Sequence, residues 1–252
     1  MTLINIMYID VHCHIDLLKD IEKTIKNARA KKVGIILTNG VDVKTNRISL
    51  KLAEKYPEIK AALGIYPIDA LKLTDNEIEK EIEFIRKNKK SIVAIGEVGM
   101  DFKWDVKEKE KQEKTFRKFI KLAKELDKPI IVHSRKAEEE CIKILEDEKA
   151  RKIVMHCFSG NSKLVKRIIE NKWTLTIPTC VKHAEQFQKM AEEIPLKQLL
   201  CETDSPFLHP DKKKNNEPAN VIVSYEKIAE LKKINIKDVE KQIEDNYIGL
   251  FG

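Results

Sequence analysis

The chain has 252 residues, 42% of them hydrophobic, so it can bury one substantial core, and its length is typical of an α/β barrel. Its apolar runs are much shorter than the ~20 residues of a membrane span, so no transmembrane segment is predicted. The net charge of +7 mildly favours acidic partners such as nucleic acid. Mixed runs such as Lys107–Lys114 are, however, typical of a solvated helix face.

The N-terminal segment and the cysteines indicate a cytoplasmic protein. Residues 1–10 lack the basic segment and apolar core of a signal peptide, and either Met1 or Met7 can be the start. The five cysteines are odd in number, scattered and without a C-x-x-C pair, which argues against a disulfide framework or a zinc ribbon. We expect them to be buried small residues in a reducing cytoplasm.

Short apolar, β-branched runs alternate along the chain with longer amphipathic stretches. The predicted strands are Tyr8–His14, Val33–Asn39, Lys60–Ile65, Ile92–Glu97, Pro129–His133, Lys152–His156, Thr174–Ile177 and Gln198–Asp204. The predicted helices, with apolar residues at 3.6-residue spacing, are Asp75–Lys89, Thr115–Leu126, Lys136–Lys149, Lys163–Asn171, Asn220–Lys233 and Ile236–Leu250. This rhythm requires parallel strands joined by helical crossovers. It predicts an α/β protein with a single-domain (β/α)₈ TIM barrel over 1–252, with an open doubly wound sheet as the alternative.

Residues that can bind metal ions stand at the ends of the predicted strands. His14, Glu97, His133, His156 and Asp204 are each the last residue of one. The carboxyl ends of barrel strands form the rim that carries the active site, because the loops there surround a common mouth. These five positions therefore predict a metal site at that rim.

The segment around the first predicted strand end contains two histidines, His12 and His14. Side chains alternate along a strand, so the two imidazoles face the same way and can bind one ion, while Cys13 faces away. Taken alone, the pattern is explained equally well by two packed histidines. Asp10 can orient an imidazole or form a structural hydrogen bond.

Two carboxylates complete the candidate ligands. Glu97, flanked by glycines, can reach between two ions, or it can cap the next segment. Asp204 can bind an ion and accept a proton as general base, or it can be a turn residue before Ser205-Pro206. Glu202 shares the strand parity of Asp204, so we expect it to face inward beside the ligands. Histidines suit zinc, manganese, nickel or iron, whereas carboxylates suit magnesium.

Seven segments together resemble the TatD family of metal-dependent hydrolases, within the amidohydrolase superfamily. They are YIDVHCHID (8–16), AIGEVGMDF (94–102), KPIIVHSR (128–135), VMHCFSG (154–160), LCETDSPFLHP (200–210), NNEPANV (215–221) and NYIGLFG (246–252). They occur in the family's order and span nearly the whole chain.

The resemblance implies a two-metal active site. It assigns the first divalent ion to His12, His14, Glu97 and Asp204, and the second to Glu97, His133 and His156. Glu97 is then the bridge, and Asp204 takes a proton from the attacking water. The family's characterised members are deoxyribonucleases with 3′→5′ exonuclease activity, so the implied substrate is nucleic acid. The site chemistry also suits an ester or amide hydrolase, for example an aminoacyl-tRNA deacylase or a small-molecule amidohydrolase. A non-catalytic nucleic-acid-binding module is a third interpretation.

Two positions depart from the family pattern. Tyr66 stands where the family usually has the histidine of Gly-x-His-Pro, so an imidazole is replaced by a hydroxyl. Asn215 replaces the arginine that usually precedes Asn-Glu-Pro. Both changes leave the implied ligands intact and bear on the substrate.

Several residues near the implied site are candidate substrate contacts: Arg135, Tyr66, His209 and Glu202. Arg135 can hold a phosphate through a bidentate contact or form a surface salt bridge. His183 is expected at the surface. Trp104 and Phe102 can stack on a base, although ordinary packing within their loop is the favoured interpretation. No obligate protein partner is indicated.

Overall fold

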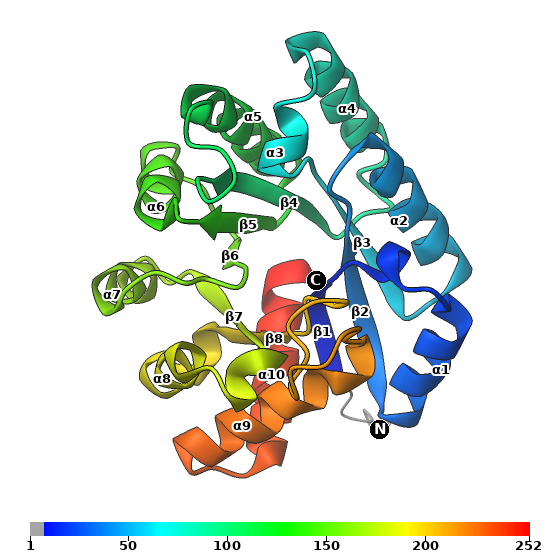
Figure 1. The fold of residues 1–252 in the computed structure, drawn as a ribbon, viewed down its shortest axis with the longest axis vertical. Helices are drawn as coiled ribbons and strands as arrows, with labels where there is room; N and C mark the ends of the chain where they lie inside the picture. Colours follow the sequence, from blue (N-terminus) through cyan, green and yellow to red (C-terminus); the bar gives the residue numbers. More distant parts are fainter. Residues whose placement is uncertain (1–7) are drawn as a thin grey trace. The chain divides into compact units, whose positions relative to one another are not determined.

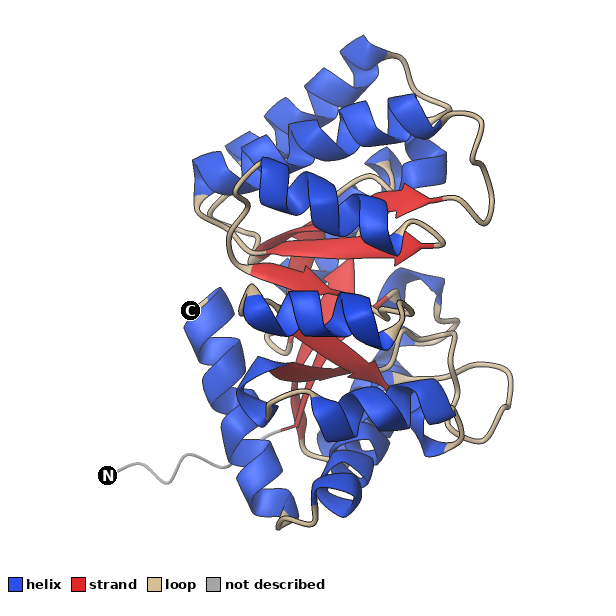
Figure 2. Ribbon diagram, turned by 90° about the vertical axis from the view of Figure 1, so that its left-hand side faces the viewer, coloured by secondary structure: helices blue, strands red, loops and turns tan. Residues whose placement is uncertain are grey.

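The computed structural model describes residues 8–252, so Met1 and Met7, the two possible starts, lie outside the described residues. Strands and helices alternate along the chain, and Figure 2 distinguishes the two kinds of element by colour. The strand order in the sheet is the chain order, β1 to β8, which is the order of a (β/α)₈ barrel. Within the described part of the chain, no helix is long and apolar enough to cross a membrane.

The element bounds are as follows. The strands are β1 (Tyr8–Cys13), β2 (Val33–Asn39), β3 (Ile59–Leu63), β4 (Ala94–Asp101), β5 (Ile130–Arg135), β6 (Ile153–Met155), β7 (Thr174–Pro178) and β8 (Leu199–Glu202). The α-helices are α1 (Ile21–Ala30), α2 (Val43–Lys55), α3 (Pro67–Ala70), α4 (Asp75–Lys87), α5 (Lys109–Leu126), α6 (Glu138–Asp147), α7 (Ser162–Glu170), α8 (Glu185–Glu193), α9 (Ile222–Lys232) and α10 (Ile236–Phe251). The 3₁₀ helices are η1 (Ile15–Leu17), η2 (Thr179–Lys182), η3 (Leu196–Gln198) and η4 (Pro218–Val221).

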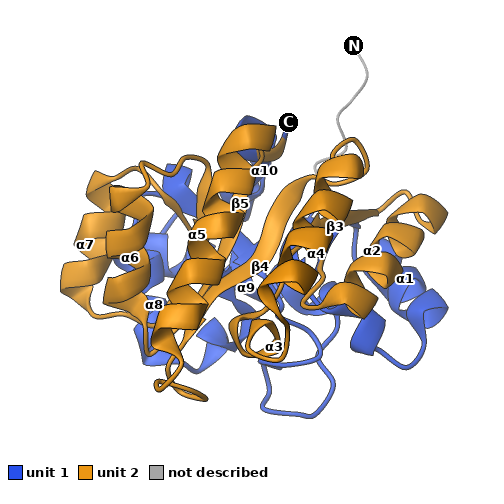
Figure 3. Ribbon diagram, turned by 90° about the horizontal axis from the view of Figure 1, so that it is seen from above, with its two compact units in different colours: residues 1–38, 176–250, 252 blue, residues 39–175, 251 orange. Residues whose placement is uncertain are grey.

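The chain groups into two compact units (Figure 3). Unit 1 contains the residues up to Thr38 together with Thr176–Leu250 and Gly252. Unit 2 contains Asn39–Leu175 and Phe251. The single domain expected over residues 1–252 stays a prediction.

In unit 1, β1 lies parallel to β2, with Ile9 opposite Ile35 and Asp10 opposite Ile36. Tyr225 of α9 is fully buried, and its hydroxyl both donates to the carbonyl of Ile9 (3.1 Å) and accepts from the Ile9 N–H (3.0 Å). This side chain therefore joins α9 to the backbone of β1 and satisfies its own hydroxyl within the core.

In unit 2, β4 is buried along its whole length, and α5 packs against it. The apolar face of α5 includes Phe116, Phe119 and Ile120, all fully buried. Figure 1 shows α4, α5 and α6 on the outer side of β4 and β5. The 3.6-residue spacing of apolar residues produces this face, because it gathers them into one stripe.

Short polar residues fix where several helices begin. Asp42 accepts from the Thr45 N–H at 2.7 Å at the start of α2, and Asn161 accepts from the Leu164 N–H at 3.1 Å at the start of α7. At α4, Thr74 and Glu77 form a reciprocal capping box. These caps satisfy backbone N–H groups that have no partner inside the helix.

The observed bounds correct the predicted strand ends. β4 continues to Asp101, since Val98 to Asp101 pair with Val132 to Arg135 of β5. Glu97 and His133 therefore lie within strands, and the prediction that each ends its strand is wrong. His14, His156 and Asp204 follow their strands rather than end them.

Helix boundaries differ as well. α5 begins at Lys109 rather than Thr115, so most of the mixed run Lys107–Lys114 belongs to the helix and is largely exposed. The helices α1, α2, α3 and α8 were not among those predicted.

Candidate metal centre

Two imidazoles meet at the end of β1, in unit 1. The Nε2 atoms of His12 and His14 are 3.4 Å apart, and the ring planes are nearly perpendicular, at 82°. The Sγ of Cys13 turns away and donates to the carbonyl of Leu37 at 3.5 Å. The predicted alternation of these three side chains is therefore confirmed.

Asp204 joins this pair through the loop that follows β8. The Asp204 N–H donates to the His12 carbonyl at 2.9 Å, and the His14 N–H donates to the Ser205 carbonyl at 2.8 Å. Asp204 has a left-handed backbone conformation, with a φ of 51°. Its Oδ1 lies 3.8 Å from Nε2 of His12 and 3.6 Å from Nε2 of His14. We call His12, His14 and Asp204 the β1 cluster.

The spacing in the β1 cluster suits a metal ion. Its three atom pairs are 3.4, 3.6 and 3.8 Å apart, longer than good hydrogen bonds. Ligand atoms about 2.05 Å from a tetrahedral ion are roughly 3.3 Å from one another. Two imidazoles and a carboxylate are also a donor set typical of zinc and other first-row transition metals. The residues present therefore fit a divalent ion.

Asp10 secures the backbone beneath the β1 cluster. Its Oδ2 accepts from the Thr203 hydroxyl at 2.6 Å, and its Oδ1 accepts from the N–H groups of Thr203 (2.9 Å) and His12 (3.3 Å). Burial raises the pKa of Asp10 to about 8, although these hydrogen bonds act to lower it. Of the two alternatives from the sequence, the structural hydrogen bond is the one observed.

Asn216 fixes the loop after β8. Its buried side chain donates to the Thr203 carbonyl at 2.8 Å and to the Thr179 hydroxyl at 3.0 Å. Its Oδ1 accepts from the Asn220 side chain at 2.8 Å and from the Glu217 N–H at 3.0 Å. The Asn216 amide thus ties the segment 215–221 to Thr203, the residue before Asp204. Residue type and spacing alone did not indicate this role for Asn216.

A second cluster lies in unit 2 and consists of Glu97, His133 and His156. Glu97 Oε1 is 2.8 Å from Nδ1 of His133 and 3.9 Å from Nε2 of His156. One ligand atom from each residue lies within 4.8 Å of the other two. We call these residues the Glu97 cluster. Two imidazoles and a carboxylate again form a donor set that fits a divalent ion.

Asp101 holds His133 in place from the other side of the ring. Its Oδ2 lies 3.0 Å from Nε2 of His133. Burial acts to lower the pKa of His133, but the hydrogen bonds with Asp101 and Glu97 outweigh it, so the pKa is raised. A ring that donates its Nε2–H to Asp101 presents the Nδ1 lone pair toward Glu97. Carboxylates orient metal-binding histidines in this way.

Asp101 was not among the site residues predicted from the sequence. The sequence did contain a pattern that indicates it, because residues 97, 99 and 101 have the same parity along one strand, so their side chains face the same way. Gly99 lies between the two acidic residues with a φ of 143°, and a Cβ added there would be 1.9 Å from the His133 carbonyl oxygen. Glycine is therefore required for β4 to lie this close to the His133 backbone.

Tyr66, which replaces the family's usual histidine, contacts the Asp101–His133 pair. Its hydroxyl donates to Asp101 Oδ2 at 2.5 Å, and its ring centroid is 4.9 Å from that of His133, at 71°. Burial of Asp101 acts to raise its pKa, yet the hydrogen bonds with His133 and Tyr66 outweigh burial and lower it. Burial and Asp101 together raise the pKa of Tyr66 well above its ordinary value. Tyr66 therefore stays a neutral donor.

The other predicted site residues lie in different surroundings. Glu202 ends β8 fully buried, as its parity predicted. His209 Nδ1 accepts from the Asp211 N–H at 3.0 Å within its own loop, so its expected contact with substrate stays a prediction. His183 is exposed, as expected. Arg135 is exposed and forms no ion pair among residues 8–252, so the salt bridge considered for it is not observed.

The prediction that Trp104 packs within its loop is wrong. This side chain is 67% exposed in the loop between β4 and α5. The backbone N–H of Trp104 donates to Asp101 Oδ1 at 3.1 Å, which fixes the turn that carries the exposed indole.

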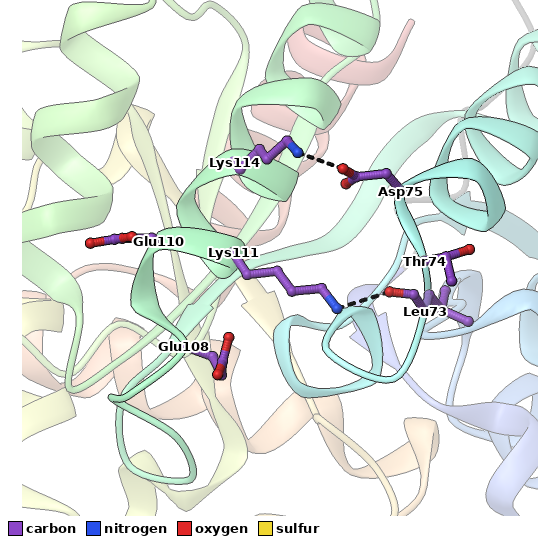
Figure 4. A pocket seen from close by; sticks show the side chains of 7 residues that line it. All are labelled: Leu73, Thr74, Asp75, Glu108, Glu110, Lys111 and Lys114. Atoms are coloured by element: carbon purple, nitrogen blue, oxygen red, sulfur yellow. Dashed lines mark hydrogen bonds and ion pairs between the residues drawn. The ribbon is translucent and has the colours of Figure 1, made fainter.

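A surface hollow of about 420 Å³ lies between the starts of α4 and α5 (Figure 4). Lys114 pairs with Asp75 at 2.5 Å, and Lys111 donates to the carbonyl of Leu73 at 2.9 Å. None of its lining residues belongs to either cluster, and its lysines are already paired with groups on the opposite wall. This hollow is therefore distinct from the metal centre.

Comparison with known proteins decides the family. The family model described as "TatD related DNase" matches residues 9–252. The chain belongs to the TatD family. The metal-dependent hydrolase YabD of Bacillus subtilis, itself uncharacterized, is 36% identical, covering 97% of this chain and 99% of YabD. Human "Deoxyribonuclease TATDN3" is 30% identical, covering 96% and 94%.

A solved structure supports the same assignment. The crystal structure of the TatD homologue YjjV from Escherichia coli superposes with a TM-score of 0.91, at 26% identity and with 97% of each chain covered. The predicted (β/α)₈ barrel of the TatD family is thus confirmed, and the open doubly wound sheet is excluded. The chain is a metal-dependent hydrolase of the TatD family.

Proposed function

We propose that this TatD-family hydrolase is a metal-dependent nuclease that removes nucleotides from DNA in the 3′→5′ direction. The observation that carries the proposal is the 3.4 to 3.8 Å spacing within the β1 cluster, which suits an ion better than it suits hydrogen bonds. The deoxyribonuclease name of human TATDN3 supports DNA as the substrate class. The net charge of +7 favours a polyanionic substrate.

The two clusters are the proposed metal ligands. His12, His14 and Asp204 would hold one divalent ion, and Glu97, His133 and His156 would hold a second. The metal is zinc, manganese, nickel, iron or magnesium, with the histidines favouring a transition metal. Bound divalent ions lower the pKa of water and neutralise charge that develops on a phosphodiester.

The chain's own residues then have defined tasks. Asp204 accepts the proton that the attacking water loses, as a carboxylate beside the reacting atoms can. Asp101 holds the His133 ring in one orientation, and Tyr66 holds Asp101. Arg135, exposed and without an ion pair among the described residues, binds a phosphate of the substrate.

The test is a matched pair of measurements on the purified protein. Metal content is determined by elemental analysis before and after dialysis against a chelator. Hydrolysis of single-stranded DNA labelled at either end is then followed with manganese, zinc, nickel or magnesium restored. We expect up to two ions per chain, chelator-sensitive cleavage, and stepwise release of label from the 3′ end.

Two further substrates sharpen the result. An RNA of the same sequence and a set of carboxylic esters and amides are tested under identical conditions. Hydrolysis of an ester or amide, with no phosphodiester cleavage for any metal, would contradict the nuclease proposal and favour an ester or amide hydrolase. Cleavage only at internal positions would contradict the exonuclease direction but keep the nuclease.

A further inference from the structure

We propose that Trp104 and Arg135 form a binding platform for one unpaired nucleobase and its phosphate. This inference rests on the proposed nuclease function and names how the substrate is held. Trp104 is 67% exposed, and the guanidinium carbon of Arg135 lies 5.9 Å from the centroid of its ring. A flat aromatic face accepts a stacked base of any sequence, and a guanidinium binds phosphate through paired hydrogen bonds.

The platform is held rigidly although it is exposed. Asp101 Oδ1 accepts from the N–H groups of Lys103 (2.9 Å) and Trp104 (3.1 Å). Gln112 of α5 donates to the Asp105 carbonyl at 2.6 Å, which secures the other side of the turn. Because the backbone that carries the indole is already ordered, little backbone freedom is lost when a base stacks on it, which suits the exposed ring to binding.

The same carboxylate connects the platform to the Glu97 cluster. Asp101 uses Oδ1 for the Trp104 backbone and Oδ2 for His133 and Tyr66. Arg135 follows His133 on β5 by two residues, and its carbonyl accepts from the Phe102 N–H at 2.9 Å. The Trp104 backbone and the His133 ring therefore contact the same carboxylate, which places the platform near the candidate metal ligands of unit 2.

The pairing of an aromatic ring with a guanidinium favours a nucleotide over other ligands. Arg135 is exposed, and its guanidinium carbon lies 5.9 Å from the centroid of the Trp104 ring. A purely apolar partner would leave Arg135 without an acceptor, and Arg135 has no ion pair among the described residues. A nucleotide supplies both a π face and an anion, so it satisfies both side chains.

Tryptophan fluorescence tests the platform without catalysis. The chain has two tryptophans, Trp104 (67% exposed) and Trp173 (8% exposed). With a chelator present to prevent cleavage, a short oligothymidylate is titrated into wild-type protein, Trp173→Phe and Trp104→Phe. We expect quenching in the first two proteins and none in the third. Quenching that persists in Trp104→Phe would overturn the platform.

Affinity measurements separate the base from the phosphate. Oligothymidylate is compared with an abasic strand of equal length, for wild-type protein and for Trp104→Ala. We expect wild-type protein to prefer the base-containing strand by roughly 5- to 150-fold, and Trp104→Ala to lose that preference. Arg135→Gln should weaken the binding of both oligonucleotides to the same extent and reduce the salt dependence of binding. Arg135→Lys should retain that salt dependence. Ile248→Ala, which removes another exposed apolar side chain (56%) from α10, is the control.

The outcomes distinguish this inference from the nuclease proposal. Equal affinity of wild-type protein for both strands, together with metal-dependent DNA cleavage, overturns the platform and keeps the nuclease. A base preference that depends on Trp104, without cleavage for any metal, supports the platform and contradicts the nuclease.

Discussion

Removing a single hydroxyl tests how the Glu97 cluster is organised. In Tyr66→Phe, Asp101 loses the donor that lies 2.5 Å from its Oδ2, while the aromatic ring against His133 is retained. Asp101 keeps His133 Nε2 and the backbone N–H groups of Lys103 and Trp104. We therefore expect a folded protein whose His133 ring is less firmly oriented.

The size of the effect follows from these contacts. A hydrogen bond to a charged group contributes ~1.5–3 kcal/mol, and the three remaining donors to Asp101 place this loss at the lower end. Loss of a group that orients a metal-binding histidine lowers affinity about 10- to 100-fold. Tyr66 acts through Asp101 rather than directly on His133, so we expect metal binding to weaken about tenfold, or ~1.4 kcal/mol.

Competition with a coloured chelator measures this affinity without relying on turnover. Zinc is titrated into metal-free wild-type protein, Tyr66→Phe, Asp101→Asn and the control Tyr56→Phe. Tyr56 directly follows α2, is partly buried, and has no hydrogen bond to its hydroxyl among the described residues, so its substitution removes the same atom without touching the cluster. Tyr66→His, which restores the family's usual residue, should keep a donor near Asp101 and retain most of the affinity.

Two results would refute the reasoning. If Tyr66→Phe binds zinc as tightly as wild type and Asp101→Asn binds it more weakly, Asp101 orients His133 without depending on Tyr66. Equal weakening in Tyr66→Phe and Tyr56→Phe would mean that the loss is a general effect of destabilisation.

Three further predictions concern catalysis and stability. Asp204→Asn should stay folded, retain metal at the Glu97 cluster and lower kcat at least ~10²-fold in a DNA cleavage assay. The control His183→Ala, at the exposed surface, should match wild type. Near-normal turnover of Asp204→Asn at saturating metal would show that Asp204 is not the proton acceptor. Gly99→Ala should destabilise the fold by at least ~3 kcal/mol in thermal unfolding, because its Cβ would lie 1.9 Å from a backbone oxygen of β5. Gly249→Ala has open space and should raise stability by up to ~1 kcal/mol, and equal effects of the two changes would contradict the argument. Asn216→Ala removes a buried amide with four hydrogen bonds and should cost ~2–4 kcal/mol in urea unfolding; a loss below ~0.5 kcal/mol would show that the loop does not depend on it.

Local sequence patterns predicted most elements of the barrel. Period-two and 3.6-residue patterns depend only on near neighbours, so all eight strands and six of the helices were expected at close to their observed positions. Boundaries were less accurate, and β4 is the clearest case. Its continuation to Asp101 depends on pairing with β5, and no local pattern reports a partner strand.

The sequence by itself also determined that two candidate ligands face the same way. His12 and His14 must share one side of a strand because side chains alternate there, and the other candidate ligands were implied by the resemblance to the TatD family. Only the tertiary structure decided how Asp101 and Tyr66 are used. Asp101 is 32 residues from His133, and Tyr66 is 35 residues from Asp101, so their hydrogen bonds exist only after three strands have come together. The exposure of Trp104 was likewise decided by the fold, because burial depends on whether distant elements cover a side chain and not on its own hydrophobicity.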